Sequence, residues 1–176
     1  MRLNTVAFSL VALLAASPAF ARGFSGTEVA WATSLREREP MPAGGVLTAS
    51  RSEPLYFWIR IQGDAEALGE LESRGMLPIR HRWVRYGGLS SSVELDATPT
   101  DEIALGIGKQ ALLPRLRQEL DARRHFDWRT WSVKNNLRAG RWAVDVLYGD
   151  VRRSPVKCRI PGETGAKPCH FEIDVR

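Results

Sequence analysis

Residues 125–149 read HFDWRTWSVKNNLRAGRWAVDVLYG and decide the fold. The segment before Leu137 is rich in aromatic and β-branched residues, which favour strands. Arg138, Ala139 and Gly140 then interrupt this run. After the interruption, apolar residues occupy every second position: Trp142, Val144, Val146 and Tyr148. A period of two is typical of a half-buried strand, so the stretch predicts two strands joined in a hairpin.

The same alternation predicts strands in the rest of the chain. It is clearest in residues 54–62, where every second residue is apolar: Leu55, Phe57, Ile59 and Ile61. Further strands are expected at residues 29–35, 78–86, 89–95, 154–158 and 171–175. Gly87 and Gly88 lie between two of these runs, and they predict a tight hairpin turn.

Two segments depart from the strand pattern and predict helices inserted between strands. Residues 64–75 place apolar residues at helical spacing between acidic ones. Residues 100–124 begin with Thr100, a suitable N-cap, followed by acidic residues that the helix dipole favours. A leucine stripe follows, formed by Leu113, Leu116 and Leu120. Such a stripe either docks the helix on its own domain or offers a groove to a partner.

Short alternating strands separated by glycine and proline turns are typical of two packed antiparallel sheets. We therefore expect one all-β domain, an antiparallel β-sandwich of about seven to eight strands. Its helical inserts are expected at about residues 64–75 and 100–124. A parallel α/β sheet is disfavoured, because helices do not recur between all the strands.

The first 21 residues have the features of a secretory signal peptide. Arg2 precedes an apolar run at residues 6–16, and Ala19-Phe20-Ala21 forms a cleavage motif. Cleavage after Ala21 predicts a mature domain of residues 22–176 that is periplasmic or secreted. A membrane anchor is the alternative, but the apolar run is short for a spanning helix. No second long apolar run follows, so we expect no membrane span after cleavage.

The charge of the chain is mildly basic. It has 25 Lys and Arg against 20 Asp and Glu, for a net charge of +5, and one of the basic residues lies in the signal segment. This charge weakly favours anionic partners, and we expect an envelope protein or an anionic glycan. Nucleic acid is disfavoured, because the chain is expected to be exported and has no long basic run with interleaved aromatics. No cofactor is indicated.

Both cysteines, Cys158 and Cys169, lie near the C-terminus and flank a turn-rich segment. In an oxidising compartment this arrangement predicts a disulfide. The alternative of a redox pair normally requires a C-x-x-C motif, which is absent. A zinc site would require more ligands than the adjacent His170 supplies, so no metal is expected.

Five segments of the chain resemble a known family. They are VAWATSLREREP (29–40), PLYFWIRIQG (54–63), PIRHRWVRYGG (78–88), WRTWSVKNNL (128–137) and GRWAVDVLYGD (140–150). The pair His81-x-Trp83 and the WRTWS run at residues 128–132 are the most specific. The chain resembles the family named domain of unknown function 2914. The resemblance implies a small β-sandwich of immunoglobulin-like type in bacterial envelope proteins, and it implies no known activity.

Residues that could carry catalysis are few. His81 shares an apolar face with Trp83, so we interpret it as a core histidine, with a general base or metal ligand as the alternative. Asp127 and Asp145 could form a pair of catalytic carboxylates, although carboxylates on exposed strand faces are common. No G-x-S-x-G motif is present. We therefore expect no catalytic residues and no enzyme.

The tryptophans divide into core and surface candidates. Trp31, Trp83 and Trp142 lie on apolar faces and are expected in the core. Trp128 and Trp131 are three residues apart, so a regular strand cannot bury both on one face. Exposed tryptophans beside arginines could stack a sugar or hold an acidic peptide. The candidate ligand-binding residues are Trp58, Arg60, Arg82, Trp128, Arg129 and Trp131, unless the insert helices cover them.

The expected function is that of a non-enzymatic binding or accessory module of the bacterial cell envelope. The first hypothesis is a protein–protein contact through the leucine-bearing second insert or an open sheet edge. The second is glycan binding through exposed tryptophans and arginines. The third is a hydrolase centred on His81, which would require a carboxylate within hydrogen-bond reach of that ring.

Overall fold

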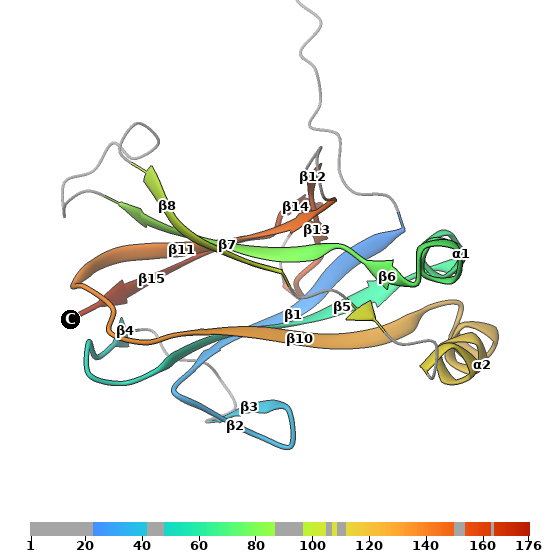
Figure 1. The fold of residues 1–176 in the computed structure, drawn as a ribbon, viewed down its shortest axis with the longest axis horizontal. Helices are drawn as coiled ribbons and strands as arrows, with labels where there is room; N and C mark the ends of the chain where they lie inside the picture. Colours follow the sequence, from blue (N-terminus) through green and yellow to red (C-terminus); the bar gives the residue numbers. More distant parts are fainter. Residues whose placement is uncertain are drawn as a thin grey trace, which may run out of the picture.

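The structure, a computed structural model, describes residues 23–41, 48–86, 97–104, 107–108, 112–149, 154–162 and 164–176. Two β-sheets pack on each other, and Figure 1 shows them as an upper and a lower layer. The expected all-β sandwich with two short helical inserts is confirmed. The signal segment expected at residues 1–21 lies outside the described residues.

The lower, five-stranded sheet has the strand order β10-β5-β1-β13-β14. Its strands are β1 (Phe24–Ala32), β5 (Leu55–Gly63), β10 (Phe126–Lys134), β13 (Lys157–Cys158) and β14 (Lys167–Pro168). The pairs β1–β5 and β5–β10 are antiparallel, whereas β13 joins β1 in parallel. One long strand, β10, therefore forms one edge, and a two-residue strand forms the other.

The upper, six-stranded sheet has the order β4-β15-β11-β7-β8, with β12 also paired to β11. Its strands are β4 (Thr48–Ala49), β7 (Ile79–Tyr86), β8 (Ala97–Ala104), β11 (Gly140–Tyr148), β12 (Ser154–Pro155) and β15 (His170–Val175). All of these pairs are antiparallel except the short β4–β15 pair. Two small hairpins complete the strands: β2 (Ser34–Arg36) with β3 (Glu39–Met41), and β6 (Met76–Leu77) with β9 (Ile107–Gly108).

The hairpin predicted within residues 125–149 is wrong. Both strands form, but β10 pairs with β5 in the lower sheet, while β11 pairs with β7 and β15 in the upper sheet. The connection between them passes from one sheet to the other at an end of the sandwich instead of turning within one sheet (Figure 1). Leu137 is buried in this crossing, and the indole Nε1 of Trp142 donates to the carbonyl of Arg138 at 2.8 Å.

The second predicted insert begins later than expected. Residues 97–104 form β8, which pairs antiparallel with β7, so Thr100 does not cap a helix. The helix α2 spans Leu113–Arg123, with Pro114 in its first turn. The expected turn at Gly87–Gly88 and the strand at residues 89–95 lie outside the described residues. Among the described residues, the antiparallel strand that pairs with β7 is β8, which begins at Ala97.

Both helices lie together at one end of the sandwich (Figure 1). Helix α1 (Ala65–Arg74) is capped by the Asp64 carboxylate, which accepts from two backbone N–H groups, and it ends at Gly75 in the left-handed region. In α2, Leu116 is fully buried, and Leu113 and Leu120 pack against the core. The leucine stripe therefore docks the helix on its own domain. Among the described residues, no helix is long and apolar enough to cross a membrane.

Large side chains from both sheets fill the core between the layers. Alternate residues of β5 point inward and are fully buried, as the sequence predicts: Leu55, Phe57, Ile59 and Ile61. Trp31, Trp83 and Trp142 are also buried, which confirms their assignment to the core. Burial of such side chains contributes about 1.5–3 kcal/mol each.

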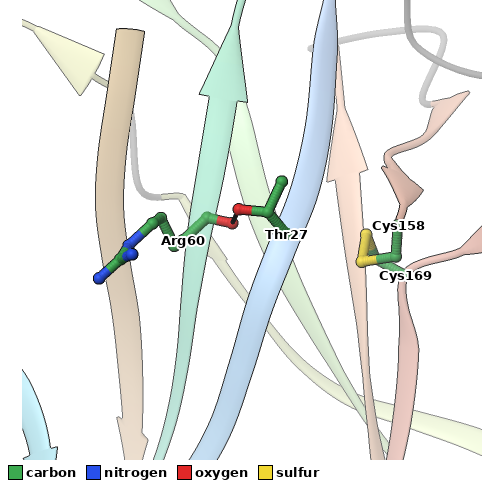
Figure 2. Close-up of a disulfide and its surroundings, with 4 residues drawn as sticks. All are labelled: Thr27, Arg60, Cys158 and Cys169. Carbon is green, nitrogen blue, oxygen red and sulfur yellow. Dashed lines mark hydrogen bonds between the residues drawn. A yellow bond between two sulfur atoms is a disulfide. The ribbon is translucent and has the colours of Figure 1, made fainter. Parts of the chain in front are cut away.

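The cysteines form the expected disulfide, with an S–S distance of 2.06 Å. It fastens the β13–β14 segment beside β1, as Figure 2 shows. Gly26 of β1 lies against it, because a Cβ at this position would be 2.5 Å from the Cys158 Sγ. Closing this loop should stabilise the fold by roughly 3 kcal/mol in the chain-entropy model.

Candidate functional site

The β2–β3 hairpin lies outside the lower sheet and covers part of its outer face (Figure 1). Glu37 and Arg38 form its tip with φ of 52° and 69°, a backbone conformation that costs energy in residues other than glycine. The carbonyl of Arg38 accepts a 2.8 Å hydrogen bond from the indole Nε1 of Trp58. Trp58 has no exposed surface, so its predicted place on the surface is wrong.

A cleft of about 250 Å³ lies between this hairpin, α2 and the start of β10. It is lined by Arg38, Leu112, Arg115, Glu119, Arg123, Asp127, Trp128 and Arg129. Two of the predicted ligand-binding residues, Trp128 and Arg129, are therefore in one site. Trp128 is half-buried and also packs against the core, so only part of the indole faces solvent.

Positive charge exceeds negative charge in the lining of the cleft. Arg115 pairs with Glu119 at 3.1 Å, and Arg123 lies 3.8 Å from a carboxylate oxygen of Asp127. Arg38 has no ion-pair partner among the described residues. Each guanidinium carries five N–H donors, and these ion pairs use few of them. The lining therefore retains donors for an anionic group.

Asp127 gives the cleft a second polar feature. Its Oδ1 is buried and has no hydrogen-bond partner among the described residues. Its backbone N–H donates to the Glu119 carboxylate at 3.1 Å, which ties the start of β10 to α2. Because Oδ1 of Asp127 is buried, it offers no contact to a ligand, and the arginines supply the polar contacts of the cleft.

The remaining predicted ligand-binding residues lie outside the cleft. Arg60, on the outer face of β5, pairs with Glu28 at 3.0 Å, and its guanidinium lies 5.8 Å from the centre of the Trp58 ring. Trp131 is half-buried and pairs in register with Trp58. Arg82 is on β7 of the upper sheet, so the structure does not bring it near the other five.

Arg82 belongs to a different cluster, on the outer face of the upper sheet. Its Nε and Nη2 both donate to one carboxylate oxygen of Asp145, at 2.9 and 2.7 Å. The other oxygen of Asp145 contacts Nδ1 of His170 at 2.6 Å. On its far side, Nε2 of His170 contacts the hydroxyl of Tyr86 at 3.0 Å and lies 3.5 Å from Glu172.

The contacts of this upper-face cluster shift the pKa values of its members. The hydrogen bond to Asp145 raises the pKa of His170, against an opposing effect of desolvation. Burial by itself would raise the pKa of Asp145, but hydrogen bonds from His170 and Arg82 outweigh it and lower that pKa. Arg82 and His170 thus satisfy both oxygens of Asp145, and few polar groups of this cluster are left for a ligand.

His81 is a core residue, as the sequence indicates. Its side chain is fully buried, its Nδ1 lies 2.9 Å from the Ser132 hydroxyl, and that hydroxyl also accepts from the Trp83 indole at 3.0 Å. Burial lowers the pKa of His81 to about 3, so the ring is neutral. Within the described residues, no carboxylate forms a hydrogen bond with His81. The described part of the chain therefore does not supply the carboxylate that the hydrolase hypothesis requires.

Three other candidate sites are a carboxylate pair, a metal site and a second hollow. Asp127 and Asp145 lie on strands of different sheets, so they do not form a pair. In the described part of the chain, no three His, Cys, Asp or Glu residues are grouped to hold a metal ion. A larger hollow of about 440 Å³ lies between the start of β1, the N-terminus of α1 and residues 157–159. Its lining mixes Lys157 and Arg159 with Asp64 and Glu66, so it has no dominant charge.

Comparison with known proteins supports the family resemblance. Residues 78–152 match the family described as Protein of unknown function (DUF2914). The match covers β7, β8, β9, α2, β10 and β11, and it leaves the resembling segments at 29–40 and 54–63 outside. No curated protein matches the chain, and no solved structure matches it either. The DUF2914 match therefore names a family without assigning a function to the cleft.

Three arginines of the cleft were missed from the sequence: Arg38, Arg115 and Arg123. A signal for two of them was present, because Arg115, Glu119 and Arg123 recur every four residues and share one face of a helix. Arg38 had no such signal, since its place depends on the hairpin folding back over the lower sheet.

Proposed function

We propose that this chain is an exported, non-enzymatic binding module of the bacterial cell envelope that holds an acidic segment of a partner protein in the arginine cleft. The observation that carries the proposal is the concentration of four arginines and a half-buried tryptophan in one cleft. Arginine is the preferred residue for holding carboxylates, because its planar N–H groups match their geometry. The signal peptide predicted at residues 1–21 and the location implied by the family resemblance support a place outside the cytoplasm.

The packing around the cleft holds its arginines in place, which favours a binding site over a group of charges that are exposed by chance. Its arginines come from a hairpin tip, a helix and a strand, and each of these elements packs on the domain. Arg129 is further fixed by Glu39 at 2.7 Å. Groups held in place before binding lose less conformational entropy when a ligand arrives. The strained Arg38 backbone fits the same view, because strain persists where the surrounding structure fixes it.

An anionic glycan is the second candidate ligand. Trp128 favours it, because a partly exposed indole can stack on a sugar ring. The two ligands share the arginine contacts, so they must be separated by experiment.

The experiment compares two charge-neutralising variants of α2. Arg115→Gln with Arg123→Gln changes the cleft, whereas Arg117→Gln changes the same helix where it pairs with Glu72 of α1 at 2.7 Å. The full chain is expressed, and mature protein is purified from the periplasm, with its mass locating the cleavage site. Fluorescein-labelled poly-glutamate and poly-galacturonate serve as probes in anisotropy titrations.

The double variant should weaken poly-glutamate binding by about tenfold or more, because each lost charge-assisted contact contributes substantially. Arg117→Gln should change it by less than about twofold. Equal affinities in wild type and double variant would remove the cleft from consideration. Binding of poly-galacturonate without binding of poly-glutamate would assign the cleft to a glycan instead. A protein found only in the cytoplasm with residues 1–21 intact would remove export from the proposal.

A further inference from the structure

The edge strand β10 is long and regular on its open side. It spans nine residues, pairs only with β5 among the described strands, and shows no break in register. Natural proteins normally protect such edges with short strands, bulges or proline. The opposite edge of the same sheet follows that rule, because β14 has two residues and is held by the disulfide. The open side of β10 has none of these protections.

The hydrogen bonds identify which backbone groups face the open side. In an antiparallel pair, the N–H and C=O of a residue point to the same neighbour, and successive residues alternate. The N–H of Asp127 donates to Glu119, so it points away from β5. The carbonyl of Arg60 accepts from the hydroxyl of Thr27, so the backbone groups of Arg60 point toward β1 and away from β10 (Figure 2). Arg129 lies opposite Arg60 in the register, so its backbone groups also point away from the β5–β10 pair, which agrees with the direction found at Asp127. The backbone groups of Asp127, Arg129, Trp131 and Val133 therefore point outward, and the N–H of Asp127 is already taken by Glu119.

This row of backbone groups begins in the arginine cleft. Arg129 lines the cleft, and the next two outward-facing residues continue along the edge. Val133 is among the few large apolar residues that are exposed, with 39% of its surface accessible. A chain that paired with this edge would have side chains opposite Arg129 within reach of the cleft. The edge and the cleft therefore form one continuous surface.

We propose that the partner's acidic segment binds in an extended conformation, as an added strand along Arg129–Val133, with a carboxylate at one end in the cleft. This inference rests on the proposed function and names the conformation of the ligand. Strand addition takes its affinity from backbone hydrogen bonds and its specificity from alternate side chains. The charge of the cleft selects acidic side chains on the face that carries Arg129 and Trp131.

A second copy of the chain fits this edge less well. It would present the same β10 sequence, FDWRTWSVK, whose only carboxylate is Asp127. That carboxylate already lies in the cleft of its own chain, so it is not available to the neighbour's arginines. Charge complementarity thus favours an acidic partner over self-association.

The test uses a display library of random twelve-residue peptides, selected on the immobilised mature protein. Selected peptides should carry acidic residues at alternate positions and lack proline in their central part. One such peptide is then synthesised and titrated against Val133→Pro and its control Val133→Thr. The Val133 N–H faces away from β5, so proline removes an open-edge donor without breaking a bond within the sheet. The threonine variant keeps the backbone donor.

Val133→Pro should lower peptide affinity by about tenfold or more, and Val133→Thr by less than about twofold. If Val133→Pro proves unfolded by circular dichroism, amide hydrogen exchange of wild type decides instead. Peptide binding should then slow exchange at Arg129, Trp131 and Val133. Unchanged exchange, or equal affinity in a folded Val133→Pro variant, would overturn strand addition.

The outcomes also separate this inference from the proposed function. If the Arg115→Gln, Arg123→Gln variant loses binding and a folded Val133→Pro variant keeps it, the proposed function is supported and strand addition is overturned. Failure to enrich any peptide would overturn strand addition, and binding of poly-galacturonate in its place would overturn the protein partner as well. Self-association of wild type that disappears in Val133→Pro would assign the edge to a second copy and overturn the inference.

Discussion

The upper-face cluster and the arginine cleft contain similar charged residues, but the charges of the first are satisfied within the protein and those of the second only in part. On the upper sheet, Arg82, Asp145, His170 and Glu172 come from neighbouring strands, and their side chains lie in contact. In the cleft, the charged residues come from a hairpin, a helix and a strand, and Arg38 has no ion-pair partner among the described residues. The first arrangement satisfies its own charges. The second leaves arginine donors that a ligand can use.

The difference shows that a count of charged residues does not identify a site. Side chains on adjacent strands meet at short distances and neutralise one another, so such clusters mainly stabilise the sheet. Side chains brought together from distant segments are held by the packing of their elements, and their charges need not balance. Three predictions test this comparison, from the largest expected effect to the smallest.

The largest effect is expected at Asp145. Asp145→Asn removes the charge that binds both Arg82 and His170, so we expect a loss of about 2 kcal/mol of unfolding free energy. Asp127→Asn is the matched change in the cleft, where Arg123 is 3.8 Å away and one carboxylate oxygen has no partner. It should change stability by less than about 0.5 kcal/mol. Urea unfolding measures both, and equal losses would contradict the contrast between the two surfaces.

A smaller effect is expected from the titration of His170. Asp145 raises its pKa in the folded state, so the stabilisation is fully present below the unfolded value near 6.5 and is lost as pH rises through the folded pKa. Because the side chain is partly exposed, screening limits the effect to about 0.5–1 kcal/mol. His170→Gln should therefore destabilise the protein more at pH 6 than at pH 9.

Two measurements check the His170 prediction. Urea unfolding of wild type and His170→Gln at both pH values gives the difference in stability, and NMR titration gives the pKa itself. In Asp145→Asn the pKa of His170 should fall toward its ordinary value, because its main partner is lost. A greater destabilisation at pH 9 than at pH 6 would show that His170 acts through packing rather than charge.

Local patterns predicted much of the framework. The strands β5, β7, β11 and β15 follow from alternation, and α1 follows from its helical spacing. The disulfide follows from the oxidising compartment expected for an exported chain. These features depend on nearby residues, so the sequence displays them directly. The pairing partner of β10 could not be predicted from the sequence, because alternation shows which face of a strand is buried and not which strand lies beside it.

The failures at Trp58 and Thr100 have the same physical origin. Alternation correctly placed Trp58 on the outer face of β5, but the β2–β3 hairpin covers that face and buries the indole. At Thr100, a threonine followed by acidic residues is a good helix start locally, yet pairing with β7 makes the segment a strand. In both places a long-range contact overrode a local preference. The cleft was only half predicted for this reason, since it requires the hairpin and α2 to meet β10.

The smallest effect is expected at the tip of the β2–β3 hairpin, where substitutions can distinguish the backbone strain of Arg38 from the role of its side chain in binding. Arg38→Gly removes the left-handed strain and the side chain, whereas Arg38→Ala removes only the side chain. The glycine variant should be more stable than the alanine variant by about 0.5 kcal/mol, because glycine tolerates positive φ. Both should weaken poly-glutamate binding equally, since each lacks the guanidinium. Glu37→Gly relieves similar strain outside the cleft, so it should raise stability and leave affinity unchanged. Weaker binding in Glu37→Gly would mean that the shape of the hairpin, and not the Arg38 charge, serves the ligand.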